Sequence, residues 1–202
     1  MSIELVIASK NPEKQLRIQQ IAEKLGILTS LFSDVSENQF EIIESGKSYL
    51  ENALLKARYA YHSTHIPSIA DDYGMEIDGL DGNPGIYTRR SENKYLNDMD
   101  LLAQTMALIR DLPPDRRKCD FVGCGVLVYS LQKYISVSQK DSGYLIPEPR
   151  GPLIPGHPLS SLLLIPKYNK TLSELKRDGY LSKDARIYTF LLSEYSTMVS
   201  EL

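Results

Sequence analysis

The chain has 202 residues, 42% of them hydrophobic and 24% charged, which is enough apolar material for the core of one globular domain. Its formal charge of −3 argues against a nucleic-acid polymer as partner, because a phosphodiester backbone requires a basic surface. The sequence shows no signal peptide and no apolar run near the ~18 residues that cross a membrane, so a cytoplasmic protein without a membrane partner is expected.

A strand, a polar loop and a capped helix are predicted at the N-terminus. Ile3 to Ala8 form a compact apolar run, and Asn11 followed by Pro12 is typical of the first residues of a helix, which is expected to end at Gly26. The free backbone N–H groups at such a helix start favour an anion. The alternative is an ordinary capped surface helix with a solvated Lys14.

Two further strands and a second helix are expected before the middle of the chain. The strands are predicted at 29–32 and 40–43. Ser48 and Glu51 have the spacing of a capping box, and the apolar stripe that follows predicts a helix to about His62.

Two adjacent acids follow the short apolar run 67–70. We interpret this run as a strand that ends in carboxylates at a turn, with Gly74 two residues beyond the acids. Neighbouring side chains on an extended backbone point to opposite faces, so Asp71 and Asp72 are expected to differ in environment. Carboxylates suit Mg²⁺, which takes one or two of them together with water and phosphate oxygens. An acid pair before glycine is also common in plain turns.

The rest of the chain predicts a mixture of helices and strands. After the turn at 83–85, Arg90 is a candidate anion contact or an ordinary surface residue. Cys119 and Cys124 lie in a strand-like run and are expected to be buried free thiols of a reducing compartment. The other expected elements are a helix capped near Asn97, paired strands at 119–129 and 134–140 with 144–146 extending the sheet, an irregular proline-rich loop at 147–158, a strand at 162–165, a capping box at Thr171 and Glu174, and a helix at 184–201.

The run 70–75, with Leu80, Gly82 and the sequence Pro-Gly-Ile-Tyr at 84–87, closely resembles the signature of the inosine triphosphate pyrophosphatase family. Members of this family hydrolyse aberrant purine nucleoside triphosphates to the monophosphate and pyrophosphate. The resemblance implies one α/β domain over residues 1–202, with a long mixed sheet flanked by helices and two lobes around a central cleft, and we expect a homodimer. Tyr73, where the family has serine, is a departure.

The resemblance also implies a triphosphate site in the N-terminal half. Ser9, Asn11 and Lys14 match the family's first motif, whose loop and lysine hold the triphosphate. Glu44 and Lys56 match its second motif, in which the glutamate helps to hold the metal and the lysine points at the phosphates. An ordinary loop acid and a solvated lysine on a helix face are the alternatives for these last two residues.

Three roles are expected around the acid pair itself. Asp71 or Asp72 would complete the Mg²⁺ ligands, and Asp72 is the best candidate to orient or deprotonate the attacking water. Lys14 and Lys56 would neutralise charge on the phosphates. Tyr73 and Gly74 are expected beside the substrate.

The C-terminal half departs from the family where the family recognises the base. The aromatic run Gly-Phe-Gly-Tyr-Asp-Pro is replaced by residues 156–161, which contain no aromatic residue apart from a histidine. The family's Ser-His-Arg motif is matched by Ser182, Lys183 and Asp184, and Asp178 stands near the place of a lysine. An acid in place of a cationic donor reverses the hydrogen-bonding preference, so the family's preference for inosine and xanthosine triphosphates is not expected to be retained.

These observations predict a Mg²⁺-dependent nucleoside triphosphate pyrophosphohydrolase that acts on nonstandard or modified nucleotides such as inosine and xanthosine triphosphates. Ser182 and Lys183 are the candidate residues for contacting the base. Two alternatives remain open: the same chemistry on a different base, and a catalytically idle nucleotide-binding homologue.

Overall fold

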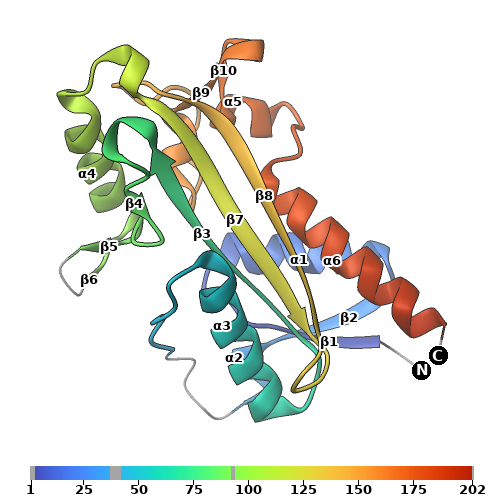
Figure 1. The fold of residues 1–202 in the computed structure, drawn as a ribbon. Coiled ribbons are helices and arrows are strands. Elements are labelled where there is room, and N and C mark those ends of the chain that lie inside the picture. The colour runs from blue at the N-terminus through green and yellow to red at the C-terminus, as the bar shows by residue number, and fades with distance from the viewer. Residues whose placement is uncertain (1–2, 37–41, 92–93, 202) are drawn as a thin grey trace. The chain divides into compact units, whose positions relative to one another are not determined.

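The computed structural model describes residues 3–36, 42–91 and 94–201, and Figure 1 shows its ribbon. Among these residues the main sheet has eight strands in the order β10-β9-β8-β7-β3-β1-β2, with β4 paired to β3. The pairs of β1 with β2 and β3 are parallel, whereas β3–β4, β8–β9 and β9–β10 are antiparallel. The predicted α/β fold with a long mixed sheet flanked by helices is confirmed.

The elements have the following bounds. The strands of the main sheet are β1 Ile3–Ile7, β2 Ile27–Leu31, β3 Ser68–Ile77, β4 Pro84–Gly85, β7 Lys118–Val128, β8 Tyr134–Leu145, β9 Leu163–Ile165 and β10 Lys170–Thr171, and a separate pair is formed by β5 Arg90–Ser91 and β6 Lys94–Tyr95. The helices are α1 Pro12–Lys24, α2 Phe32–Val35, α3 Tyr49–Thr64, α4 Asp98–Arg110, α5 Leu172–Arg177 and α6 Lys183–Ser200. None of the helices in this described part of the chain is long and apolar enough to cross a lipid bilayer.

The contacts divide the chain into two compact units. Unit 1 comprises Met1–Asp72, Gly123–Gln139 and Asp184–Leu202, and unit 2 comprises Tyr73–Val122 and Lys140–Lys183. Three of the four boundaries fall inside the long strands β3, β7 and β8, and the fourth falls between Lys183 and Asp184 at the start of α6.

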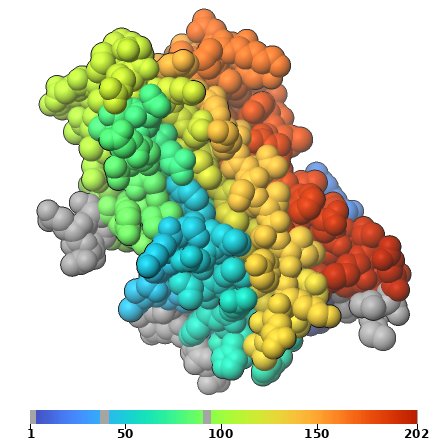
Figure 2. Space-filling view, in the orientation of Figure 1, coloured from blue at the N-terminus to red at the C-terminus, as the bar shows by residue number. Residues whose placement is uncertain are grey.

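In unit 1, helices cover both faces of the sheet because the strand side chains alternate. One face carries residues such as Leu5, Ile69 and Leu127, which pack with α1 and α6. The opposite face carries their neighbours, such as Ala70 and Val126, which pack with α3. On the face drawn in Figure 2, α3 lies beside the β7–β8 hairpin, consistent with a guanidinium carbon of Arg58 5.8 Å from the Tyr134 ring centroid.

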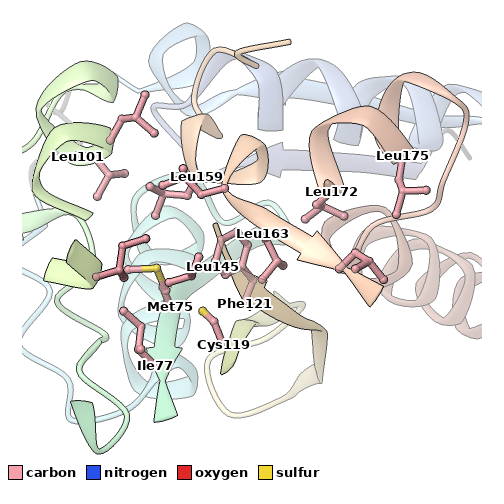
Figure 3. Close-up of a cluster of buried hydrophobic side chains, with 14 of the residues drawn as sticks. Met75, Ile77, Leu101, Cys119, Phe121, Leu145, Leu159, Leu163, Leu172 and Leu175 are labelled. Atoms are coloured by element: carbon pink, nitrogen blue, oxygen red, sulfur yellow. The ribbon is translucent and has the colours of Figure 1, made fainter. Parts of the chain in front are cut away.

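Unit 2 has its own apolar core. Figure 3 shows Met75 and Ile77 from β3 together with Cys119 and Phe121 from β7 and with leucines of β8 and β9. Helices α4 and α5 complete this core. Met75 and Ile77 are buried on either side of Glu76, which has intermediate exposure, so this end of β3 has a buried side in unit 2 as well.

Most predicted elements are confirmed, and one interpretation was wrong. The strand before the acid pair does not end at a turn: β3 continues to Ile77, so Asp71, Asp72 and Gly74 lie inside it. Two consecutive acids suggested an end because charged residues are rarely buried inside a strand unless they are paired. The predicted strand at 40–43 lies partly outside the described residues, and residues 42–46 have no regular structure. Both cysteines are buried free thiols, as expected.

Candidate active site

The acid pair lies on β3 at the end of the first segment of unit 1, and its two carboxylates face opposite sides of the strand. Asp71 shares the face of Ile69 and accepts a hydrogen bond from Lys14 Nζ of α1 at 2.6 Å. Asp72 shares the face of Ala70 and accepts from Asn52 Nδ2 of α3 at 3.0 Å. The predicted difference between the two acids therefore follows from the alternation of the strand.

Asp71 and Lys14 form a buried ion pair, with side chains only 5% and 6% exposed. Burial alone would raise the pKa of Asp71, but the charges of Lys14 and Lys56, together with the hydrogen bond from Lys14, outweigh it and the pKa is lowered. The lysine is positioned by the start of α1, where Asn11 Oδ1 accepts from the backbone N–H groups of Glu13 and Lys14. Ser9 Oγ in turn accepts from the Asn11 N–H at 3.2 Å. Ser9 and Asn11 thus order the loop and helix start that hold Lys14.

On the other face, Lys56 lies between two acids. Its Nζ is 2.6 Å from Glu44 Oε1 and 3.4 Å from Asp72 Oδ1. Burial lowers the pKa of Lys56, but the charges of Asp72 and Glu44 more than reverse this, so the pKa is raised. Burial raises the pKa of Asp72 despite its contacts with Lys56 and Asn52.

Asn52 is a site residue that the sequence reasoning did not select. Its side chain is fully buried, donates to Asp72 and accepts from the Gly46 N–H at 2.9 Å. It therefore ties the loop after Glu44 to the acid pair. The available signal was its position four residues before Lys56, which places both side chains on one face of α3.

The carboxylates on the α3 side suit a hard cation. Among residues 3–36, 42–91 and 94–201, no group of three or more His, Cys, Asp or Glu side chains is arranged to hold a metal ion. Mg²⁺ requires only one or two carboxylates when water and phosphate supply the remaining ligands. Glu44 and Asp72 already share one cationic group, the ammonium of Lys56. Their donor chemistry therefore fits Mg²⁺, whereas Asp71 faces the other side of the strand.

In unit 2, the side chain of Tyr73 is surrounded by three polar residues. Its hydroxyl accepts a hydrogen bond from Arg89 Nε at 2.9 Å. Its ring stacks on that of His157, with centroids 5.9 Å apart and an interplanar angle of 30°. Lys183 Nζ lies 5.0 Å from the centre of the same ring. Tyr73, His157 and Lys183, all of which depart from the family's motifs, are thus brought together.

The remaining candidates lie in several places. Gly74 is buried within β3, and the guanidinium of Arg90 lies 6.0 Å from the centre of the Tyr87 ring. Ser182 is fully buried, and its hydroxyl has no hydrogen-bond partner among the described residues. The sequence selected Arg90 and not its neighbour Arg89, which makes hydrogen bonds to Tyr73, Leu96, Asp98 and Gly156.

Two acids near the C-terminus differ in burial. Asp184, at the first turn of α6, is 4% exposed and belongs to unit 1, where its charge acts on the pKa of Asp71. Asp178 is on the surface and pairs with Lys170 at 2.7 Å. Asp178 is therefore a surface ion-pair residue, and Asp184 adds negative charge near the acid pair.

The mixed sheet with its flanking helices defines an α/β protein. The carboxylates on its strand β3, paired with lysines of unit 1, define a charged site. The particular family follows from comparison: residues 5–186 match the Ham1 family, and the chain belongs to it. This finding confirms the resemblance to inosine triphosphate pyrophosphatases.

The similarity to known proteins extends over most of the chain. A protein of Yersinia pseudotuberculosis named dITP/XTP pyrophosphatase is 30% identical over 178 residues, which cover 86% of this chain and 87% of the relative. A protein of the same name from Dictyoglomus thermophilum is 32% identical over 180 residues, covering 86% and 83%. The structure of a HAM1 protein from Coxiella burnetii matches with a TM-score of 0.80 at 26% identity, covering 99% of this chain and 100% of that one.

Proposed function

We propose that this protein is a nucleoside triphosphate pyrophosphohydrolase, which converts a nucleoside triphosphate and water into a nucleoside monophosphate and pyrophosphate. Nonstandard nucleotides such as inosine and xanthosine triphosphates are the proposed substrates, since related proteins carry the name dITP/XTP pyrophosphatase. The observation that carries the proposal is the position of the Lys56 ammonium between Glu44 and Asp72. This arrangement provides negative charge for a cation and positive charge for phosphates within a few ångströms.

Asp72 is the proposed base. Its pKa is raised by burial, so its carboxylate binds a proton more readily than that of an ordinary aspartate. Asp71 is unsuited to this role, because Lys14 lowers its pKa. Two neighbouring acids with pKa values shifted in opposite directions have distinct roles, as expected for an acid–base site.

In the proposed reaction, water attacks the α-phosphorus and the bond from that phosphorus to the bridging oxygen breaks. Asp72 accepts the proton of the water, and pyrophosphate leaves with the bridging oxygen. Lys56 and Lys14 neutralise phosphate charge; an ammonium has three N–H donors, so each lysine can bind phosphate and keep a carboxylate partner. Glu44 and Asp72 would hold Mg²⁺, which when bound supplies further charge neutralisation at the triphosphate.

The same reaction on a different base is a second candidate. It is favoured by the Tyr73, His157 and Lys183 cluster, which presents rings and an ammonium in place of the family's base-reading motif.

The cytoplasmic homodimer expected from the sequence is also part of the proposal, and the two buried free thiols agree with a reducing compartment. Sedimentation at assay concentrations tests the dimer.

The deciding experiment measures pyrophosphate release from inosine, xanthosine, adenosine, guanosine and pyrimidine triphosphates, with and without Mg²⁺. Asp72→Asn serves as the inactive control. Release that depends on Asp72 supports the proposed chemistry, and loss of release in EDTA with recovery on adding Mg²⁺ supports the metal. Binding of nucleotides without any release would instead identify an idle homologue.

A further inference from the structure

A closed set of hydrogen bonds in unit 2 holds both main-chain polar groups of one residue, Gly156, in the proline-rich segment 147–157. The Gly156 N–H donates to Asp98 Oδ2 at 2.6 Å, and the Gly156 carbonyl accepts from Arg89 Nη2 at 2.7 Å. Arg89 Nη2 also pairs with Asp98 Oδ1 at 2.8 Å. Arg89 and Asp98, here called the clamp, therefore hold both polar groups of Gly156 and each other.

The clamp is one attachment of this segment, and further attachments lie near its start. Near its start, Arg150 pairs with Glu174 at 3.0 Å, and hydroxyls of α5 and its cap donate to the carbonyls of Arg150 and Pro152. Between these points residues 153–155 contain no helix or strand. Such a segment depends on a few contacts for its position, so the clamp determines where Gly156 and the next residue lie.

The clamp also fixes an aromatic ring. Arg89 Nε donates to the Tyr73 hydroxyl, and that hydroxyl lies 3.4 Å from the Gly156 carbonyl. His157, which directly follows Gly156, stacks on the Tyr73 ring, and the Lys183 ammonium lies over the same ring. With its hydroxyl engaged by Arg89 and Gly156, Tyr73 can offer a ligand the face of its ring.

Arg89 has little remaining capacity to bind phosphate directly. A guanidinium has five N–H donors, and this one makes four hydrogen bonds, to Tyr73, Leu96, Asp98 and Gly156. Its side chain is only 11% exposed. These contacts suit a residue that acts through others.

We propose that Arg89 and Asp98 are positioning residues for base selection. They hold His157 against Tyr73, and the rings of His157 and Tyr73 then select the base together with Lys183. The inference rests on the proposed function, because it assigns these residues to the base of a nucleotide. A preorganised set of contacts discriminates better than a mobile one, since a displaced group no longer penalises the wrong ligand.

The test compares Arg89→Ala, the milder Arg89→Lys and Asp98→Asn with the wild type. Arg150→Ala is the matched control, because it removes an arginine that ties the same segment elsewhere. Hydrogen exchange of the Gly156 amide is expected to rise at least about tenfold in the clamp variants, as the loss of a hydrogen bond to a charged group predicts. In Arg150→Ala it is expected to stay unchanged.

Kinetics supply the second readout. In the clamp variants, KM for the nucleotide with the highest kcat/KM should rise about tenfold, while kcat stays within a few-fold of the wild-type value. The differences in kcat/KM between nucleotides with different bases, here called the base spread, should become smaller. Arg150→Ala should keep the wild-type spread. If Arg89→Ala or Asp98→Asn fails to fold, Arg89→Lys alone decides the test, because it keeps the positive charge and loses the fork geometry of the guanidinium.

The outcomes separate this inference from the proposed function. If the wild type hydrolyses nucleotides and the clamp variants keep both the exchange rate and the base spread, the clamp has no positioning role. Faster Gly156 exchange with an unchanged base spread likewise overturns the inference, while the proposed function stands. If the wild type neither binds nor hydrolyses any nucleoside triphosphate, both proposals fail.

Discussion

The buried pair of Lys14 and Asp71 allows a quantitative prediction about stability. Lys14→Met keeps most of the apolar side chain and removes the ammonium that lies 2.6 Å from the carboxylate. Asp71 is then left as a buried charge without its closest cationic partner. Removing one partner of a buried ion pair costs about 3–5 kcal/mol, a large part of the roughly 5–15 kcal/mol that stabilises a typical domain.

The cost should depend on pH in a definite direction. In the wild type the pKa of Asp71 is lowered below that of an ordinary aspartate, so the pair stabilises the fold fully above the ordinary pKa and loses its effect as the pH falls through the lowered one. In Lys14→Met, burial dominates and raises the pKa of Asp71, so the folded state gains a proton more readily than the unfolded chain. The stability difference between wild type and variant should therefore be largest at pH 7 and shrink as the pH falls towards 4.

Urea unfolding at pH 7 and pH 5 measures both effects. Arg17→Met is the matched control on the same helix, because its pair with Glu13 is partly exposed, at 30% and 20%, and should contribute only about 0.3–0.5 kcal/mol. The double variant Lys14→Met with Asp71→Leu should recover much of the loss, since it leaves no unpaired charge. A loss below about 1 kcal/mol at pH 7 in Lys14→Met would refute the reasoning, because isolated buried charges cost more.

Four further predictions concern the reaction. Asp72→Asn should abolish pyrophosphate release while leaving the urea midpoint nearly unchanged; activity within a few-fold of the wild type would remove Asp72 from the mechanism. Lys56→Ala should weaken binding of triphosphates far more than of monophosphates in calorimetry, and equal losses would place the lysine elsewhere. Asn52→Leu should move the acidic limb of the kcat/KM profile to higher pH, because the Asn52 hydrogen bond lowers the pKa of Asp72; an unmoved limb would separate that limb from Asp72. Finally, the preference for inosine over adenosine triphosphate should be below about a hundredfold, since the site lacks the family's cationic donors, and a larger ratio would contradict the assignment of Lys183.

The helix starts and the alternating strands could be predicted from sequence because their causes are local. Asn11, Asn97 and Thr171 cap helices where the spacing predicted. The opposite orientation of Asp71 and Asp72 also followed from the geometry of an extended chain. Each of these features depends on a few neighbouring residues and not on distant partners.

The features that could not be predicted depend on contacts between residues that are far apart in the chain. Strand β3 passes through two acids because Lys14 and Asn52, 57 and 20 residues away, pair with them. Without those partners, two carboxylates would end a buried strand. The role of Arg89 depends in the same way on Gly156, 67 residues later. Pairing over such separations leaves no periodic signal in the sequence.

One boundary in the chain separates the acid pair and its partners from Tyr73, His157 and Lys183, three of the residues that depart from the family's motifs. Strand β3 passes from unit 1 to unit 2 between Asp72 and Tyr73. The carboxylates with their lysines lie before this boundary, whereas the Tyr73 ring and its partners lie after it. Because Lys14, Lys56 and Asn52 all come from unit 1, exchanges at His157 or Lys183 leave the ion pairs of the acids in place. A change of base preference through His157 or Lys183 can therefore arise in unit 2 without rebuilding those ion pairs, whereas Asp184 lies in unit 1 and its charge acts on the pKa of Asp71.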